Sequence, residues 1–94
     1  MPMKNPPHPG RTIRYDCVEA LGLTIAEAAK HLQVEDEALA DICECRAPIT
    51  ADMAIRFEMA FGSTAEFWLR LQAAHDLAQA RKTTCNITRI ERAA

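Results

Sequence analysis

Residues 24–46 read TIAEAAKHLQVEDEALADICECR, and this stretch decides the fold. It opens with Thr24-Ile25-Ala26-Glu27, which matches a capping box. In that motif the threonine oxygen accepts a hydrogen bond from the amide three residues on, and the glutamate accepts one from the amide of the threonine. The spacing predicts a short amphipathic helix after this cap. Its inward residues are expected to be Ala28, Ala29 and Leu32, and its outward residues Lys30 and His31.

The second half of the stretch predicts another short helix, which starts near Glu35 after a break at Gln33-Val34. The face expected to be buried carries Ala38, Leu39, Ile42 and Cys43, and the opposite face carries Asp36, Glu37, Ala40, Asp41 and Glu44. Two short amphipathic helices joined by a turn of three or four residues are the anatomy of a helix-turn-helix. Because paired short helices also occur in bundles that never touch DNA, the pattern alone leaves the function open.

Upstream of this unit the chain divides into an arm and a first helix. Four of the five prolines lie within residues 1–9, so residues 1–10 are predicted to form an extended arm. Helical spacing begins at Arg11, and Gly22 is placed to end the helix. The apolar side of this helix is expected to carry Ile13, Cys17, Val18 and Leu21.

Downstream, two further helices are predicted. Pro48 ends the preceding segment, and Thr50 caps a helix whose buried residues are expected to be Met53, Ala54, Phe57, Ala60 and Phe61. Ser63-Thr64-Ala65-Glu66 is a second capping-box candidate, and it opens the longest helix, at about 65–81. The stripe of that helix is expected to be Phe67, Leu71, Ala74 and Ala78, widened by Trp68 and Leu77.

The chain is therefore predicted to be all-α, with five helices in one domain at 11–82, an arm at 1–10 and a tail at 83–94. Its 94 residues suit a single domain, and 49% hydrophobic residues are enough for a core. No apolar run is long enough to span a membrane, and the Pro-rich start does not resemble a signal peptide, so a cytoplasmic protein is expected. The net charge of -2 is unusual for a protein that binds nucleic acid.

The residues that carry most enzyme and metal chemistry are not patterned for it. The four cysteines are expected to be reduced thiols, with Cys17 and Cys43 in the core and Cys45 and Cys85 exposed. The histidines at 8, 31 and 75 lack a paired ligand spacing, so no metal is expected. No catalytic triad, paired-carboxylate cleft or phosphate-binding glycine loop is apparent. We therefore expect neither a cofactor nor enzyme activity.

Several strings together resemble the HigA-type (VapI-like) antitoxins, which are lambda-repressor-like helix-turn-helix proteins of the XRE family. These strings are NPPHPG at 5–10, LGLT at 21–24, ITADMAIRF at 49–57, FG at 61–62 and EFWLRLQAAHDLAQA at 66–80. The resemblance implies a cytoplasmic dimer that binds a HigB-type toxin, a small and generally basic endoribonuclease. It also implies that the protein represses transcription of its own operon, so the implied partners are the toxin, operator DNA and a second copy.

The resemblance and the helix-turn-helix pattern together assign two candidate sites. The expected DNA-binding residues are Thr24, Lys30, Asp36, Glu37, Asp41 and Arg46. Arg11, Arg14 and Arg56 are further candidates for phosphate contacts. The expected dimerisation residues are Phe67, Trp68, Leu71 and His75, although an aromatic pair such as Phe67-Trp68 is also typical of a core.

The segment from Glu35 to Glu44 departs from the apparent family, because five of the thirteen acidic residues fall within it and Arg46 is the only basic residue nearby. The rest of the chain carries eleven basic residues against the eight remaining acidic ones, so the deficit is local. Carboxylates on a recognition helix repel phosphates, yet they can also accept from cytosine N4. Two alternatives therefore stay open beside the antitoxin-repressor: a toxin-binding module without DNA binding, and a solitary repressor.

Overall fold

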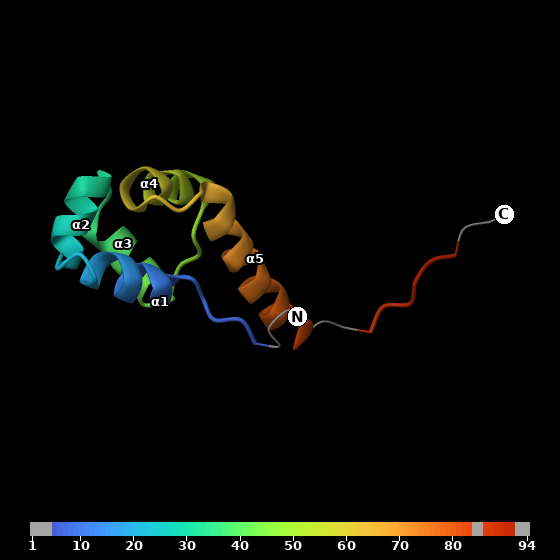
Figure 1. Ribbon diagram of the computed structural model, residues 1–94. Helices are drawn as coiled ribbons and strands as arrows, with labels where there is room; N and C mark the ends of the chain where they lie inside the picture. The colour runs from blue at the N-terminus through green and yellow to red at the C-terminus, as the bar shows by residue number, and fades with distance from the viewer. Residues whose placement is uncertain (1–4, 84–85, 92–94) are drawn as a thin grey trace.

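The computed structural model describes residues 5–83 and 86–91, and within these ranges every regular element is helical (Figure 1). The elements are α1 (Gly10–Thr12), η1 (Ile13–Glu19), α2 (Ile25–Leu32), α3 (Asp36–Cys43), α4 (Ala51–Phe61) and α5 (Ala65–Arg81). Because α1 runs directly into η1, the two form one continuous first helix, here called helix 1. The prediction of an all-α, five-helix protein is confirmed. None of the helices in these ranges is long and apolar enough to cross a bilayer.

Helix 1 differs from the prediction in its winding. After one turn of α-helix it continues as a π-helix, whose hydrogen bonds join residues five apart. Ile13 and Val18 are five apart and both are buried, whereas Leu21, expected in the core, is 63% exposed. Leu21 lies beyond the end of η1, where the Leu23 amide donates to the Val18 carbonyl at 3.0 Å and Gly22 adopts a positive φ of 72°. The altered winding therefore moves the inward face away from Leu21.

The start of helix 1 lies directly against the last turn of α3. A side chain at Gly10 would overlap the backbone carbonyl oxygen of Ile42, so only glycine permits this approach. The Gly10 amide donates to Nδ1 of the buried His8 at 2.9 Å. Within the NPPHPG string, Gly10 thus allows the close contact between helix 1 and α3, and His8 accepts the hydrogen bond of the Gly10 amide.

Capping residues define where the helices begin. Thr24 and Glu27 form the predicted capping box, with hydrogen bonds of 3.1 Å and 2.9 Å. Thr50 caps α4 as predicted. The second capping box is wrong in detail, because Thr64 caps α5 alone and the carboxylate of Glu58 accepts from the Ala65 amide instead of Glu66 acting in the box.

One cluster of buried side chains joins all the helices. Trp68 and Phe57 are its largest members, and their rings meet edge to face with centroids 6.1 Å apart. The cluster consists of Ile13, Val18, Ala28, Ala29, Leu32, Leu39, Ile42, Cys43, Ile49, Met53, Ala54, Phe57 and Trp68. Cys43 is therefore buried as predicted, Cys17 only partly so, and Cys45 is exposed as predicted, whereas Cys85 lies outside the described residues.

The buried stripe of α5 agrees with the prediction only at Trp68. Trp68 and Gln72 are its buried residues, while Phe67 and Leu77 are 39% and 52% exposed. Leu77 is exposed because it lies toward the end of α5 that extends beyond the other helices, with the arm beside it (Figure 1). Gln72 is tolerated inside because its side chain accepts from the Ile49 amide at 2.8 Å and donates to Asp76 at 2.9 Å.

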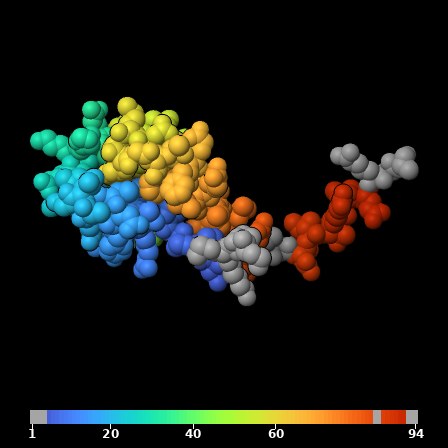
Figure 2. All heavy atoms as spheres, viewed as in Figure 1, coloured from blue at the N-terminus to red at the C-terminus, as the bar shows by residue number. Residues whose placement is uncertain are grey.

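The described part of the tail, residues 86–91, has no helix or strand and runs away from the helical body (Figures 1 and 2). Its two isoleucines, Ile87 and Ile90, are 83% and 90% exposed.

Candidate nucleic-acid interface

The helix-turn-helix unit is formed by α2 and α3, two helices of 8 residues each. Between them Gln33 adopts a left-handed conformation with a φ of 61°, and the Val34 amide closes the end of α2 on the Ala29 carbonyl at 3.0 Å. Leu39, Ile42 and Cys43 anchor α3 in the core. The opposite side of α3 therefore faces outward.

The six residues expected to bind DNA lie on this unit and just beyond it. They differ in whether their side chains already have hydrogen-bond or ion-pair partners within the protein. Thr24 is engaged in its capping box at the start of α2. Lys30 is exposed in the last turn of α2 and its side chain forms no hydrogen bond or ion pair with the described residues. Asp36 and Glu37 are exposed in the first turn of α3, which is where a recognition helix contacts base edges.

Arg46 is held by two acidic residues of α3. Its guanidinium donates to Asp41 Oδ1 from Nη2 at 2.9 Å and from Nε at 3.3 Å, and it also pairs with Glu44. The hydrogen bonds to Asp41 raise the pKa of Arg46 above its usual range. Arg46 is therefore already paired within the protein and is not free to contact a phosphate.

Three carboxylates remain without such a partner. Glu35 occupies the N-cap position of α3 but its side chain forms no capping hydrogen bond. The side chains of Asp36 and Glu37 form no hydrogen bond or ion pair with any described residue. The acidic character of α3 is thus concentrated at its N-terminal end.

Two of the three additional arginines are also engaged. Arg56 donates from Nη1 to the Leu32 carbonyl at 2.7 Å, and this bond caps the C-terminal end of α2. From Nε it also donates to Asp52 at 2.9 Å. Arg14 pairs with Glu19 at 3.2 Å. Arg11 is exposed and its side chain has no partner among the described residues. The sequence did not reveal these roles, because which arginine meets which carbonyl depends on the packing of α2 against α4.

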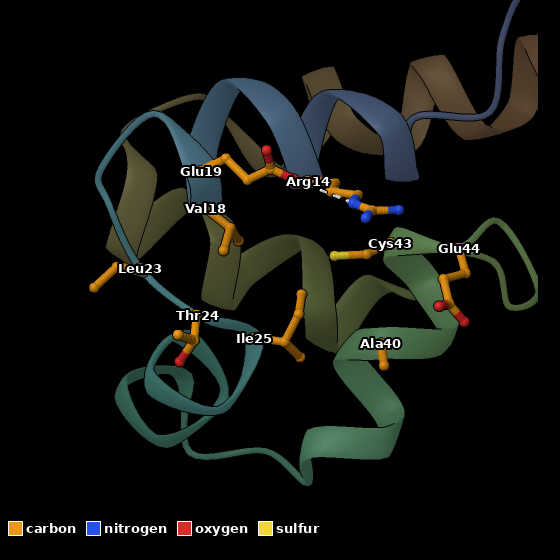
Figure 3. Close-up of a pocket in the computed structure, with 9 residues that line it drawn as sticks. All are labelled: Arg14, Val18, Glu19, Leu23, Thr24, Ile25, Ala40, Cys43 and Glu44. Carbon is orange, nitrogen blue, oxygen red and sulfur yellow. Dashed lines mark hydrogen bonds and ion pairs between the residues drawn. The ribbon is translucent and has the colours of Figure 1, made fainter.

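A cavity of about 250 Å³ lies between helix 1 and the helix-turn-helix unit (Figure 3). Apolar side chains, among them Val18 and Ile25, line it together with Arg14, Glu19 and Glu44. Burial raises the pKa of the Cys43 thiol in this cavity to about 11, so the thiol stays protonated at neutral pH and is a poor nucleophile. Among the described residues, no group of three or more His, Cys, Asp or Glu side chains is placed to hold a metal ion.

The four residues expected to form a dimer contact lie on α5, and all but Trp68 keep accessible surface. Phe67 is exposed and packs edge to face on Trp68, with ring centroids 5.0 Å apart. Trp68 is only 1% exposed, so it belongs to the core of the single chain and not to a surface open to a second copy. Leu71 is half-buried. His75 contacts the arm, with Nδ1 3.0 Å from the Pro6 carbonyl and its ring 5.1 Å from that of His8.

Comparison with known proteins gives this fold and surface a context. No protein-family model matches the chain. The virulence-associated protein A' of Dichelobacter nodosus is 45% identical over 89 residues, which cover 94% of this chain and 76% of the relative. An uncharacterised helix-turn-helix transcriptional regulator of Escherichia coli K12, YddM, is 32% identical over 98% of this chain and 96% of its own length.

Solved structures agree with these relatives. The antitoxin HigA of Pseudomonas aeruginosa, solved with the higBA promoter, superposes with a TM-score of 0.80 at 35% identity, covering 83% of this chain and 85% of that one. The antitoxin GraA gives 0.79 at 36% identity, covering 83% and 84%. Fold and exposed α3 surface thus define a small helix-turn-helix protein of the antitoxin and transcriptional-regulator class. Within that class, the chain belongs to the HigA family of antitoxins.

Proposed function

We propose that this protein is the antitoxin of a HigBA-type module, and that as a dimer it binds operator DNA and represses transcription of its own operon. The observation that carries the proposal is the α2–α3 unit with its exposed outer side, in a chain 35% identical to an antitoxin solved with its promoter. In helix-turn-helix proteins the second helix enters the major groove. We therefore assign base contacts to α3 and positioning contacts to Thr24 and Lys30.

The acidic end of α3 weakens DNA binding without preventing it. A carboxylate about 7 Å from a phosphate in a water-like dielectric is repelled by roughly 0.6 kcal/mol, so three cost on the order of 2 kcal/mol before screening by salt. Specific recognition typically exceeds non-specific binding by about 4–10 kcal/mol. Since Asp36 and Glu37 can also accept hydrogen bonds from cytosine N4, part of this cost is recoverable.

The DNA-binding half is tested with a duplex covering the region directly upstream of the gene. Binding is measured by fluorescence anisotropy at several stated salt concentrations, because phosphate contacts make affinity salt-dependent. We expect specific binding that exceeds binding to a scrambled duplex of the same length. Equal affinity for the two duplexes, with and without the toxin, would remove the repressor role.

For the toxin-binding half, the support is family membership together with charge. Glu35, Asp36 and Glu37 form an uncompensated acidic patch, which favours association with a basic ribonuclease. The arm with helix 1 is a second candidate surface. The test is a ribonuclease assay with the toxin encoded beside this gene: an equimolar amount of this protein is expected to abolish RNA cleavage, and undiminished cleavage would contradict the proposal.

The dimer is proposed to use the exposed part of α5. Phe67, Leu71 and His75 remain candidates, since each keeps some accessible surface, whereas Trp68 is enclosed by its own chain. Sedimentation equilibrium of the wild type and of Phe67→Glu tests this. We expect a dimer that the substitution dissociates, and an unchanged dimer would place the contact elsewhere.

A second candidate function keeps the toxin and drops the DNA, and the unpartnered Asp36 and Glu37 favour it. The test is the double variant Asp36→Asn/Glu37→Gln beside a control with the same change in charge elsewhere, Asp16→Asn/Glu66→Gln. Loss of operator affinity in the first variant would show that these carboxylates read bases. Weakened toxin neutralisation with no change in operator affinity would support the toxin-binding module instead.

A further inference from the structure

Two cavities beside helix 1 share three of their lining residues. The first is the cavity of Figure 3, which reaches Thr24 at the start of α2 and Ala40 on α3. The second, of about 310 Å³, is lined by Arg11, Arg14, Tyr15, Cys43, Glu44 and Cys45. Both contain Arg14, Cys43 and Glu44, so one surface runs from the start of α2 along α3 to the N-terminal end of helix 1.

Basic side chains with capacity for a new anion lie at the helix 1 end of this surface. Arg11 is exposed and unpaired among the described residues. Arg14 lies beside Tyr15, with its guanidinium carbon 5.3 Å from the ring centroid, which orients the guanidinium by a cation–π contact. Its ion pair with Glu19 is about half exposed on both sides, and pairs of this kind are weak and easily exchanged.

The negative groups around these arginines have basic partners within the protein. Glu44 and Asp41 share the guanidinium of Arg46, which offsets one of their two negative charges. Glu19 is the partner of Arg14. Arg11 is therefore a basic side chain of this surface that has no acidic partner among the described residues. Together with the Arg14 guanidinium and the Tyr15 hydroxyl it presents donors suited to a phosphate oxygen.

We propose that Arg11 and Arg14 clamp a backbone phosphate of the DNA duplex at the edge of the groove that α3 enters. The proposal rests on the proposed operator binding. It assigns to helix 1 the phosphate contacts that Arg46 and Arg56 do not supply, because those two arginines are held by Asp41, Glu44, Asp52 and the Leu32 carbonyl. Helix 1 then acts as a positioning element for α3, against which Gly10 packs.

The test measures how the affinity for the upstream duplex depends on salt in Arg11→Gln, in Arg14→Gln and in the control Arg70→Gln. Arg70 is an exposed arginine on α5 without a partner among the described residues. Each phosphate contact contributes a slope of about -0.9 in a plot of log affinity against log salt. We expect Arg11→Gln to lower the steepness by about one unit per bound subunit, with roughly a fivefold loss of affinity per subunit at physiological salt. Arg70→Gln is expected to match the wild type.

The possible outcomes separate the clamp from the function on which it rests. If the wild type binds the upstream duplex and Arg11→Gln and Arg14→Gln keep its slope, the clamp is wrong and operator binding stands. If the wild type binds no duplex even at low salt, the proposed operator binding fails and the clamp fails with it. Should the variants keep the slope but lose toxin neutralisation, the surface binds protein and the phosphate assignment is overturned. Thermal unfolding followed by circular dichroism verifies that each variant is folded.

Discussion

At the scale of the single residue, Gly10 shows how one position determines the placement of a whole helix. Its missing side chain lets helix 1 touch the backbone of α3 at Ile42. We expect Gly10→Ala to destabilise the protein by about 1–3 kcal/mol, since a backbone carbonyl cannot move aside as a flexible side chain would. Urea unfolding followed by circular dichroism measures this, with Asn5→Ala, an exposed site in the same segment, as the control. A variant as stable as the wild type would mean that helix 1 shifts without cost.

Gln72 is the second residue whose role is structural. It is 5% exposed and its side chain satisfies the Ile49 amide. Replacing it with leucine keeps similar bulk but leaves that buried amide without a partner, which typically costs about 1–3 kcal/mol. The same substitution at the exposed Gln79 is the control and is expected to change the free energy of unfolding little. Equal stability of Gln72→Leu and the wild type would contradict the assigned role.

At the scale of the element, the arm is attached through His8, which lies between α5 and the start of helix 1. Burial, together with the nearby His75, lowers the pKa of His8 below its ordinary value of 6.5. Protonation also removes the Nδ1 lone pair that accepts from the Gly10 amide. Because the unfolded chain binds this proton more readily, the stability contributed by His8 is complete above pH 6.5 and is lost as the pH falls below that value.

We therefore expect the urea midpoint of the wild type to fall between pH 7.5 and pH 5.5, and that of His8→Gln to fall less. His31→Gln, which removes an exposed histidine on α2, serves as the control and should retain the wild-type pH dependence. An unchanged pH dependence in His8→Gln would show that other groups cause it.

The elements also show what sequence reasoning could and could not predict. The capping box at Thr24 and the glycine at 62 predicted helix ends correctly because caps are local hydrogen bonds and backbone conformations. The sequence did not predict the π-helix, because nearly one extra residue per turn requires no particular amino-acid composition. It changes only which residues point inward. Leu77 was wrongly assigned to the stripe of α5 because periodicity does not reveal which end of a long helix has neighbours.

At the scale of the whole molecule, the net charge is -2, and the ion pairs as well as the composition determine which parts of the surface are acidic or basic. The sequence located the acidic segment at 35–44, but it could not show that Arg46 pairs with Asp41 and Glu44 and that Glu35, Asp36 and Glu37 have no such partner. Nor could it show that Arg56 serves α2, because that contact joins residues 24 apart in the chain. The candidate interface is consequently acidic at one end of α3 and basic on helix 1.

The burial of Trp68 makes it an intrinsic fluorescence probe of the fold. The chain has one tryptophan, enclosed by Phe57 and Phe67 and remote in sequence from α2 and α3. Its intrinsic fluorescence therefore reports on the packing of the core, in which α4 and α5 meet. Unfolding exposes the indole and shifts the emission to longer wavelength, whereas a partner bound to the exposed side of α3 is expected to shift it little, because Trp68 is 1% exposed. A single spectrum thus distinguishes a variant that has lost its fold from one that has lost only its ligand.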